Sequence, residues 1–239
     1  MNFLQLLTLQ LVAHLLADFF FQTDKWVEDK NSSGIRSRYF LMHLGLVFIT
    51  SWLLSFQWQF IAAAGTITLL HAIIDMLKSI LSRSFKVRRY LFFIDQMLHL
   101  GVLAGVTWWF SSNFTLEPWF RIVFSERTLF IVFAFLFCTK PANILIRELF
   151  NLYRISAPKT ENSSKELPNA GKLIGNMERL LTLTFMLIGR FEAVGLLIAA
   201  KSILRFGEKD TLKSEYVVVG TLLSFGIAIF IGVILMFVF

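Results

Sequence analysis

The chain has 239 residues, of which 56% are hydrophobic and only 16% carry a formal charge. So few charged residues cannot coat a water-soluble globule of this size, and the mean hydropathy of +0.67 agrees. The net charge of +7 comes without aromatic–basic interleaving or a glycine-rich phosphate loop, so we expect no nucleic-acid partner. The lone Cys138 excludes an internal disulfide and a cysteine-based metal cage.

Apolar runs of about 20 residues recur along the chain, which predicts an all-α, polytopic transmembrane helix bundle. The interruption GRFEA, at 189–193, divides one overlong segment into two short ones, and we expect a hairpin there rather than a single crossing. The resulting eight spans, four plus four, are 2–22, 39–57, 60–81, 90–111, 128–149, 172–189, 191–206 and 215–238.

The distribution of Lys and Arg between the loops predicts how these spans are oriented. Loops 23–38 and 82–90 are basic, whereas the turn around 57–59 is uncharged and loop 112–127 balances its acids and bases. Positively charged loops stay in the cytoplasm, so the N-terminus is predicted to lie outside. We expect two domains: a four-helix membrane bundle at 1–112 and a second helical half at 113–239, the latter with a cytoplasmic linker at about 151–171.

One histidine falls in each of the first four spans, and three of them have an aspartate one helical turn away, in HLLAD, HAIID and DQMLH. The predicted orientation brings all of these groups to one depth, about 5–15 Å from the cytoplasmic boundary at 1.5 Å rise per residue. The glutamines Gln22 and Gln96 lie at the same depth and are expected to support them. The candidate metal ligands are His14, Asp18, His43, His71, Asp75, Asp95 and His99.

Buried carboxylates are costly in a bilayer, at about 2.5–3.5 kcal/mol each near its centre, so they need partners inside the bundle. A divalent cation would compensate their charge, and imidazole with carboxylate suits Zn²⁺, Mn²⁺ or Fe²⁺. Seven candidates exceed one tetrahedral site: either two metals bind, or some aspartates orient the imidazoles. Asp75 or Asp95 is also a candidate catalytic base toward a metal-bound water. The alternative is that His–Asp pairs only hydrogen-bond between helices and fix their packing.

These motifs resemble a known family. HLLADFxxQ, a histidine that opens the second span, HxxxD and FxxDQxxH are similar to the bacterial membrane family called domain of unknown function 3307. The resemblance continues through GKLIGNMERLL, IAAKSILRF and EYVVVGTLLSFGIAI, and so covers nearly the whole chain. It implies a fold and a bacterial inner-membrane location, but no activity. A weaker similarity is to bacterial inner-membrane metal-dependent hydrolases, although their DxDH string is missing here.

The second half carries a different polar set, again predicted toward the cytoplasm. Glu178 and Lys201 are expected to form an ion pair, and Pro141 is expected to kink the fifth span. The basic members favour a pocket for a phosphate or carboxylate, such as a lipid headgroup; the alternative is that paired charges hold short helices together. The candidate anion-binding residues are Lys140, Arg147, Arg179, Lys201 and Arg205.

Three functions fit these patterns. The first is an intramembrane metal-dependent hydrolase of an amphiphilic substrate, such as a lipid phosphate or a membrane peptide. The second is a non-catalytic membrane scaffold or sensor. The third is a transporter of a divalent cation or protons, which is less favoured because no polar stripe is evident through the external halves of the spans.

Overall fold

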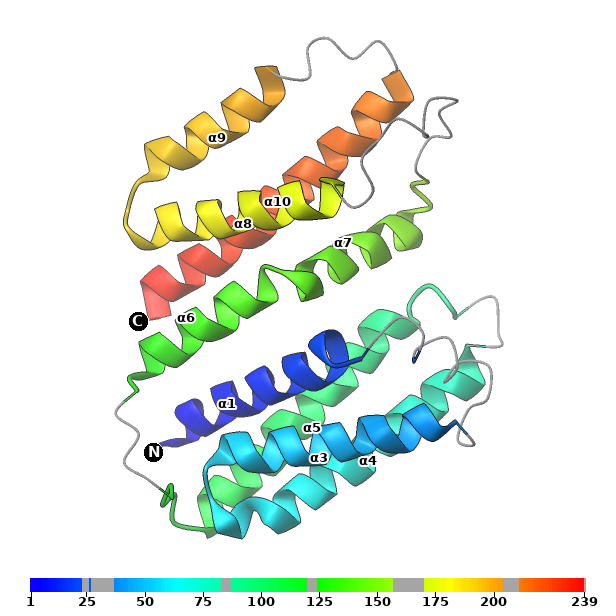
Figure 1. The fold of residues 1–239 in the computed structure, drawn as a ribbon, viewed down its shortest axis with the longest axis vertical. Coiled ribbons are helices and arrows are strands. Elements are labelled where there is room, and N and C mark those ends of the chain that lie inside the picture. Colours follow the sequence, from blue (N-terminus) through cyan, green and yellow to red (C-terminus); the bar gives the residue numbers. More distant parts are fainter. Residues whose placement is uncertain are drawn as a thin grey trace. The chain divides into compact units, whose positions relative to one another are not determined.

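The computed structural model describes residues 1–22, 26, 37–82, 87–119, 124–156, 170–203 and 211–238. Every regular element in these ranges is helical. The chain divides into two compact units, Met1–Phe133 and Ala134–Phe239, and the division falls within one helix, α6 (Glu126–Phe137). Figure 1 follows the chain through both units.

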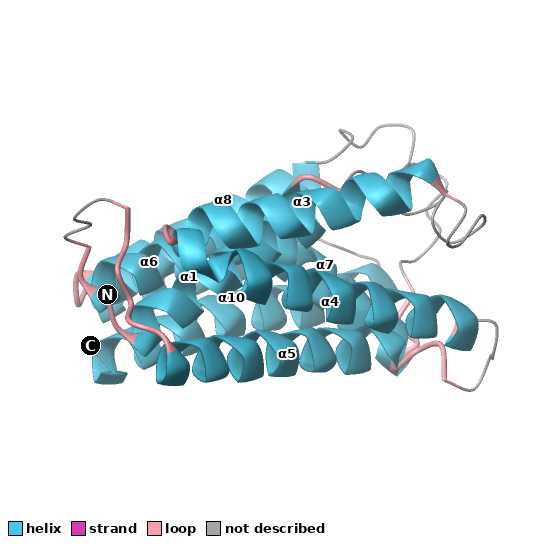
Figure 2. Ribbon diagram, turned by 90° about the horizontal axis from the view of Figure 1, so that it is seen from below, coloured by secondary structure: helices cyan, strands magenta, loops and turns pink. Residues whose placement is uncertain are grey.

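The first unit contains a closed ring of four helices. Helix α1 packs against α3 and α5, and α4 also packs against α3 and α5, so each helix has two neighbours (Figures 1 and 2). The elements are α1 (Phe3–Leu15), the π-helix η1 (Leu16–Phe20), α3 (Arg38–Ser55), the 3₁₀ turn η3 (Trp58–Phe60), α4 (Ile61–Leu81) and α5 (Leu91–Asn113).

Local sequence signals fix where these helices begin and end. Asn2 and Gln5 form a capping box at the start of α1, where each side chain accepts a hydrogen bond from the other's backbone N–H. Ser37 caps α3 in the same position, and Phe56 ends that helix in the left-handed conformation with φ 54°. A core that includes Leu6 and Phe110 fills the end of the ring where α1 begins and α3 ends.

The second unit begins at a break in the chain direction. Helix α6 and the following α7 (Lys140–Tyr153) are bent by 53° at Cys138 and Thr139, next to Pro141, as the sequence predicted. The remaining helices are α8 (Ala170–Leu187), α9 (Phe191–Ile203) and α10 (Thr211–Val238). Helix α10 runs along α8, and α7 contacts both.

The segment around GRFEA forms a hairpin and not a single crossing. Helix α8 ends at Leu187, Gly189 turns the chain with a φ of +71°, and α9 folds back beside α8 (Figure 1). A side chain at this position would be strained, so the glycine is required by the turn.

Five described helices are long and apolar enough to cross a membrane, and the bent pair α6–α7 gives up to six. The chain is therefore a helical membrane protein. Helix α9 has only 13 residues, or about 20 Å at 1.5 Å per residue, which is shorter than the roughly 30 Å hydrocarbon core. The eight-span count and the external N-terminus stay predictions.

Candidate metal centre

The ring of four helices brings its four histidines together, one each from α1, α3, α4 and α5. His71 lies at the centre of this group. Its ring centroid is 4.1 Å from that of His99, 5.1 Å from that of His43 and 6.0 Å from that of His14. All four side chains are buried, with at most 7% of any residue exposed.

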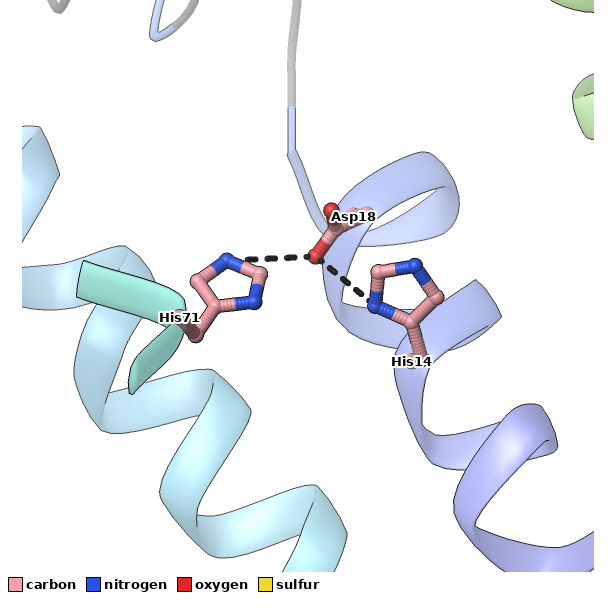
Figure 3. Close-up of side chains that lie close together, drawn as sticks. All are labelled: His14, Asp18 and His71. Atoms are coloured by element: carbon pink, nitrogen blue, oxygen red, sulfur yellow. Dashed lines mark ion pairs between the residues drawn. The ribbon is translucent and has the colours of Figure 1, made fainter. Parts of the chain in front are cut away.

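The aspartates reach the same place because each lies one turn from a histidine on its own helix. Asp18 lies in the π-helix, where the Phe21 N–H donates to the Leu16 carbonyl over 2.9 Å. Such single π turns occur frequently at functional sites because they redirect a side chain. Figure 3 shows the result: Oδ1 of Asp18 points between His14 Nδ1 at 3.6 Å and His71 Nε2 at 3.7 Å.

Two imidazoles and two carboxylates form the inner part of the cluster. The Nε2 atoms of His43 and His71 are 3.0 Å apart. Asp18 Oδ1 lies 3.7 Å from each of these nitrogens. Asp75 Oδ2 lies 3.8 Å from the first and 3.7 Å from the second. Two carboxylate oxygens, from η1 and α4, therefore lie within 3.8 Å of the paired His43 and His71 nitrogens.

Asp95 and His99 form the outer part. Oδ2 of Asp95 accepts hydrogen bonds from Lys78 Nζ over 2.7 Å and from Gln96 Nε2 over 3.1 Å. Its other oxygen, Oδ1, faces His99 Nδ1 at 3.7 Å. Within the described part of the chain, neither ring nitrogen of His99 nor Oδ1 of Asp95 has a hydrogen-bond partner, although both residues are buried.

Among the described residues there are three groups, and within each group the ligand atoms lie within 4.8 Å of one another. They are His14–Asp18–His71, His43–His71–Asp75 and Asp75–Asp95–His99. Together they contain every histidine and aspartate that the sequence suggested as a ligand. The donor set, imidazole nitrogen with carboxylate oxygen, suits a divalent transition metal.

The two supporting glutamines differ in their placement. Gln96 donates to Asp95, and its Oε1 lies 3.4 Å from His14 Nε2. Gln22 is half-buried just beyond the π-helix. A third glutamine, Gln10, was missed. It lies one turn before His14 and exchanges hydrogen bonds with Ser51 of α3. Extending the four-residue spacing back from His14 would have found it.

A small pocket adjoins the cluster on the side of Gln10. Its polar lining includes Gln10 and Ser51 together with His14, His71 and His99. Most of its surface is apolar and comes from all four helices and the π-helix.

The basic residues of the second half have protein partners. Lys201 Nζ lies 2.5 Å from Glu178 Oε2, and Arg147 lies 3.5 Å from Glu148. Arg179 is only 1% exposed, and its guanidinium donates to acceptors on α7, α8, α10 and the α6–α7 break. Lys140 is half-buried in the first turn of α7. Arg205 lies outside the described residues.

A protein family matches the part of the chain that forms the four-helix ring. The family described as "Protein of unknown function (DUF3307)" matches residues 6–125, which is half of the chain. The chain belongs to this family. The match includes α3, α4, α5 and all seven cluster residues, so the cluster lies inside the DUF3307 region. No curated protein and no solved structure matches the chain.

Proposed function

We propose that this DUF3307 protein is a membrane metalloprotein that binds a divalent transition-metal ion in its His/Asp cluster. The observation that carries the proposal is a set of distances. Six nitrogen–oxygen separations between the cluster's histidines and aspartates all lie between 3.6 and 3.8 Å.

These distances separate a ligand set from interhelical hydrogen bonding. A hydrogen bond between imidazole and carboxylate would bring the two atoms to about 2.7–3.2 Å. Two ligands held about 2.0–2.2 Å from one tetrahedral ion lie roughly 3.3–3.6 Å apart. The six histidine–aspartate separations are therefore longer than hydrogen bonds and close to the spacing that one shared ion imposes. The nitrogens of His43 and His71, which are 3.0 Å apart, would have to separate by about 0.3 Å to bind the same ion.

Charge supports the same proposal. Three carboxylates converge within the bundle, and one of them, Asp95, pairs with Lys78. Ionised carboxylates in a bilayer need compensating charge, and a divalent ion supplies more of it than any side chain. Imidazole ligands favour Zn²⁺, Mn²⁺ or Fe²⁺ over Mg²⁺ and Ca²⁺, which prefer oxygen.

We infer that the ion serves hydrolysis of an amphiphilic substrate. A bound divalent ion can activate water at neutral pH. The pocket beside His71 and His99 is a place for such a water, and Asp95, one helical turn from His99, is the candidate acceptor for its proton. Asp75 is the alternative base. Because the site lies inside a membrane bundle, its substrate would come from the bilayer.

Basic residues at one end of the bundle support a site that opens toward the cytoplasm. Arg38 begins α3 and Lys78 lies in the last turn of α4, at the end of the bundle where the cluster lies. Arg88 and Arg89 precede α5 at this end. Under the positive-inside rule this end faces the cytoplasm. We therefore place the protein in the bacterial inner membrane, with its site toward the inner leaflet.

Transport of a divalent cation or protons is a second candidate, because buried polar residues continue beyond the cluster. Gln10, Ser51 and Thr107 lie about one to two turns from the histidines of α1, α3 and α5, toward the opposite end. Leu6, Phe60 and Phe110 then close that end with apolar packing. The apolar closure favours the enzyme over a continuous pathway.

The first test is elemental analysis of the purified full-length protein beside three variants. We expect stoichiometric metal in the wild type, and its loss in His71→Ala and in the nearly isosteric Asp18→Asn. Thr107→Val is the matched control: its hydroxyl is buried on α5 without a hydrogen-bond partner in the described structure, so it should keep its metal. A wild-type protein without metal, even after reconstitution with Zn²⁺, Mn²⁺ and Fe²⁺, would overturn the proposal.

The activity is tested separately in proteoliposomes. Metal-dependent release of phosphate from isoprenoid or lipid phosphates, lost in Asp95→Asn although that variant still binds metal at His43 and His71, supports the hydrolase. Metal-dependent cleavage of membrane peptides with the same dependence also supports it. Ion flux across the vesicle membrane without any hydrolysis would instead support transport.

A further inference from the structure

Asp75 connects two parts of the cluster. The groups His14–Asp18–His71 and His43–His71–Asp75 both contain Nε2 of His71. An imidazole nitrogen has one lone pair, so both groups describe a single ion position. The group Asp75–Asp95–His99 shares only Asp75 with them. A carboxylate has two oxygens, so this residue can serve two positions at once.

The buried side chain of His99 indicates that the second position holds an ion. The residue is 2% exposed, and its ring nitrogens have no hydrogen-bond partner in the described parts of the chain. Leaving a buried polar group unsatisfied costs about 1–3 kcal/mol. A shift of less than about 1 Å would let His99 Nδ1 bond to Asp95 Oδ1, yet the two atoms stay 3.7 Å apart.

Asp95 is held so that its Oδ1 stays apart from Nδ1 of His99. Lys78 and Gln96 both bind its Oδ2 and so fix the carboxylate from one side. Its Oδ1 is thereby aimed at His99. Groups that orient a metal ligand through its second atom commonly surround metal centres. Lys78 and Gln96 therefore leave Oδ1 of Asp95 open toward His99.

We infer that the metal centre is dinuclear. The first ion lies among Asp18, His43 and His71, with Asp75 Oδ2. The second ion lies between Asp95 Oδ1 and His99, and Asp75 bridges the two. This inference rests on the proposed metal binding but goes further, because a single ion among the inner ligands would satisfy that proposal equally well.

The charge of such a centre indicates its substrate class. Two divalent ions and the Lys78 ammonium carry two more positive charges than the carboxylates of Asp18, Asp75 and Asp95 can neutralise. In a water-poor bundle this surplus favours an anionic further ligand. The phosphate or carboxylate of an amphiphile would supply such a ligand.

Metal stoichiometry of the full-length protein tests the inference. The protein is loaded with Mn²⁺, freed of excess metal and analysed for ions per chain and by electron paramagnetic resonance. We expect two ions per chain with an exchange-coupled spectrum in the wild type. His99→Gln should reduce this to one uncoupled ion. Asp75→Asn should lose coupling and weaken both positions. Thr107→Val, also on α5, should keep two coupled ions.

The outcomes distinguish the two proposals. One uncoupled ion in both wild type and His99→Gln would overturn the dinuclear inference and leave the proposed metal binding standing. Two ions in His99→Gln would also overturn it, because the second ion would then lie elsewhere. No ion in the wild type would overturn both. His99→Ala and size-exclusion profiles of all variants separate loss of a ligand from loss of the fold.

Discussion

The Nε–H of Arg179 donates to the carbonyl oxygen of Cys138 over 2.6 Å, at the point where α6 and α7 separate. Pro141 offers no N–H to continue the helix, and the last carbonyls of α6 are the negative end of its dipole. The buried guanidinium therefore donates hydrogen bonds to the backbone carbonyls of Cys138 and Thr139 at the break. Asn143, Asn176 and Ser224 accept its other hydrogen bonds.

Replacing this arginine should weaken the second unit substantially. We expect Arg179→Met to lower the free energy of unfolding by about 2–4 kcal/mol, because several buried acceptors lose their donor at once. Arg179→Lys should recover little of this loss, since one ammonium cannot span the same acceptors. Reversible unfolding in mixed detergent measures both.

The matched control is Arg147→Met on α7, whose side chain is 65% exposed and pairs with Glu148 at 3.5 Å. Its effect should stay below about 0.5 kcal/mol. Equal losses in the two variants would show that Arg179 is not the residue that holds the break.

A second prediction concerns the close contact between α8 and α10. A Cβ atom added at Gly232 would lie 2.7 Å from Cβ of Met186, so the backbones must separate. We expect Gly232→Ala to destabilise the protein by about 1–3 kcal/mol. Gly226→Ala, six residues earlier on α10, meets nothing within 4 Å and should be neutral or stabilising by up to about 1 kcal/mol. Thermal unfolding compares the pair, and a similar loss in both would contradict this packing.

The depth argument explains why the cluster could be predicted from the sequence. Helical periodicity fixes which face a residue occupies, and the alternation of spans fixes its depth. His43 has no aspartate beside it in sequence, yet its place near the start of α3 brought it to His71. Pro141 and Gly189 are likewise local signals, the first for the break between α6 and α7 and the second for the turn between α8 and α9.

What could not be predicted depends on tertiary contacts. The π turn that aims Asp18 has no signal in LADFF, because its wider hydrogen-bond ring is decided by packing. Arg179 was proposed to hold an external anion. Its buried partners on three helices arise only once α7, α8 and α10 have docked, and no spacing within α8 indicates them.

Lys78 gives a prediction that links stability to metal. In metal-free protein its ammonium pairs with Asp95, whose side chain is 3% exposed, so Lys78→Met should cost about 1–3 kcal/mol. With ions bound, the carboxylates are already compensated and the loss should shrink. The metal-induced rise in Tm should therefore be larger in the variant than in the wild type.

Lys201→Met is the control for this effect, because its 2.5 Å pair with Glu178 involves no residue of the cluster. Its loss of stability should be the same with and without metal. The idea fails if the two lysine variants respond to metal alike.

Acidification gives the last prediction, because protons and metal ions compete for the same imidazole nitrogens. His43 and His71 must be neutral to bind the first ion and His99 to bind the second, so metal binding releases protons and weakens as the pH falls. Lowering the pH from about 7.5 to 5.5 should weaken overall metal binding, because protons and metal ions compete for the imidazole nitrogens. Competition with a fluorescent chelator measures the slope of log affinity against pH. His99→Gln removes one imidazole ligand and should bind less metal over this pH range, whereas Thr107→Val should keep the slope of the wild type. Binding that does not change over this range would mean that the ions are held without the histidines, against both the mononuclear and the dinuclear arrangement.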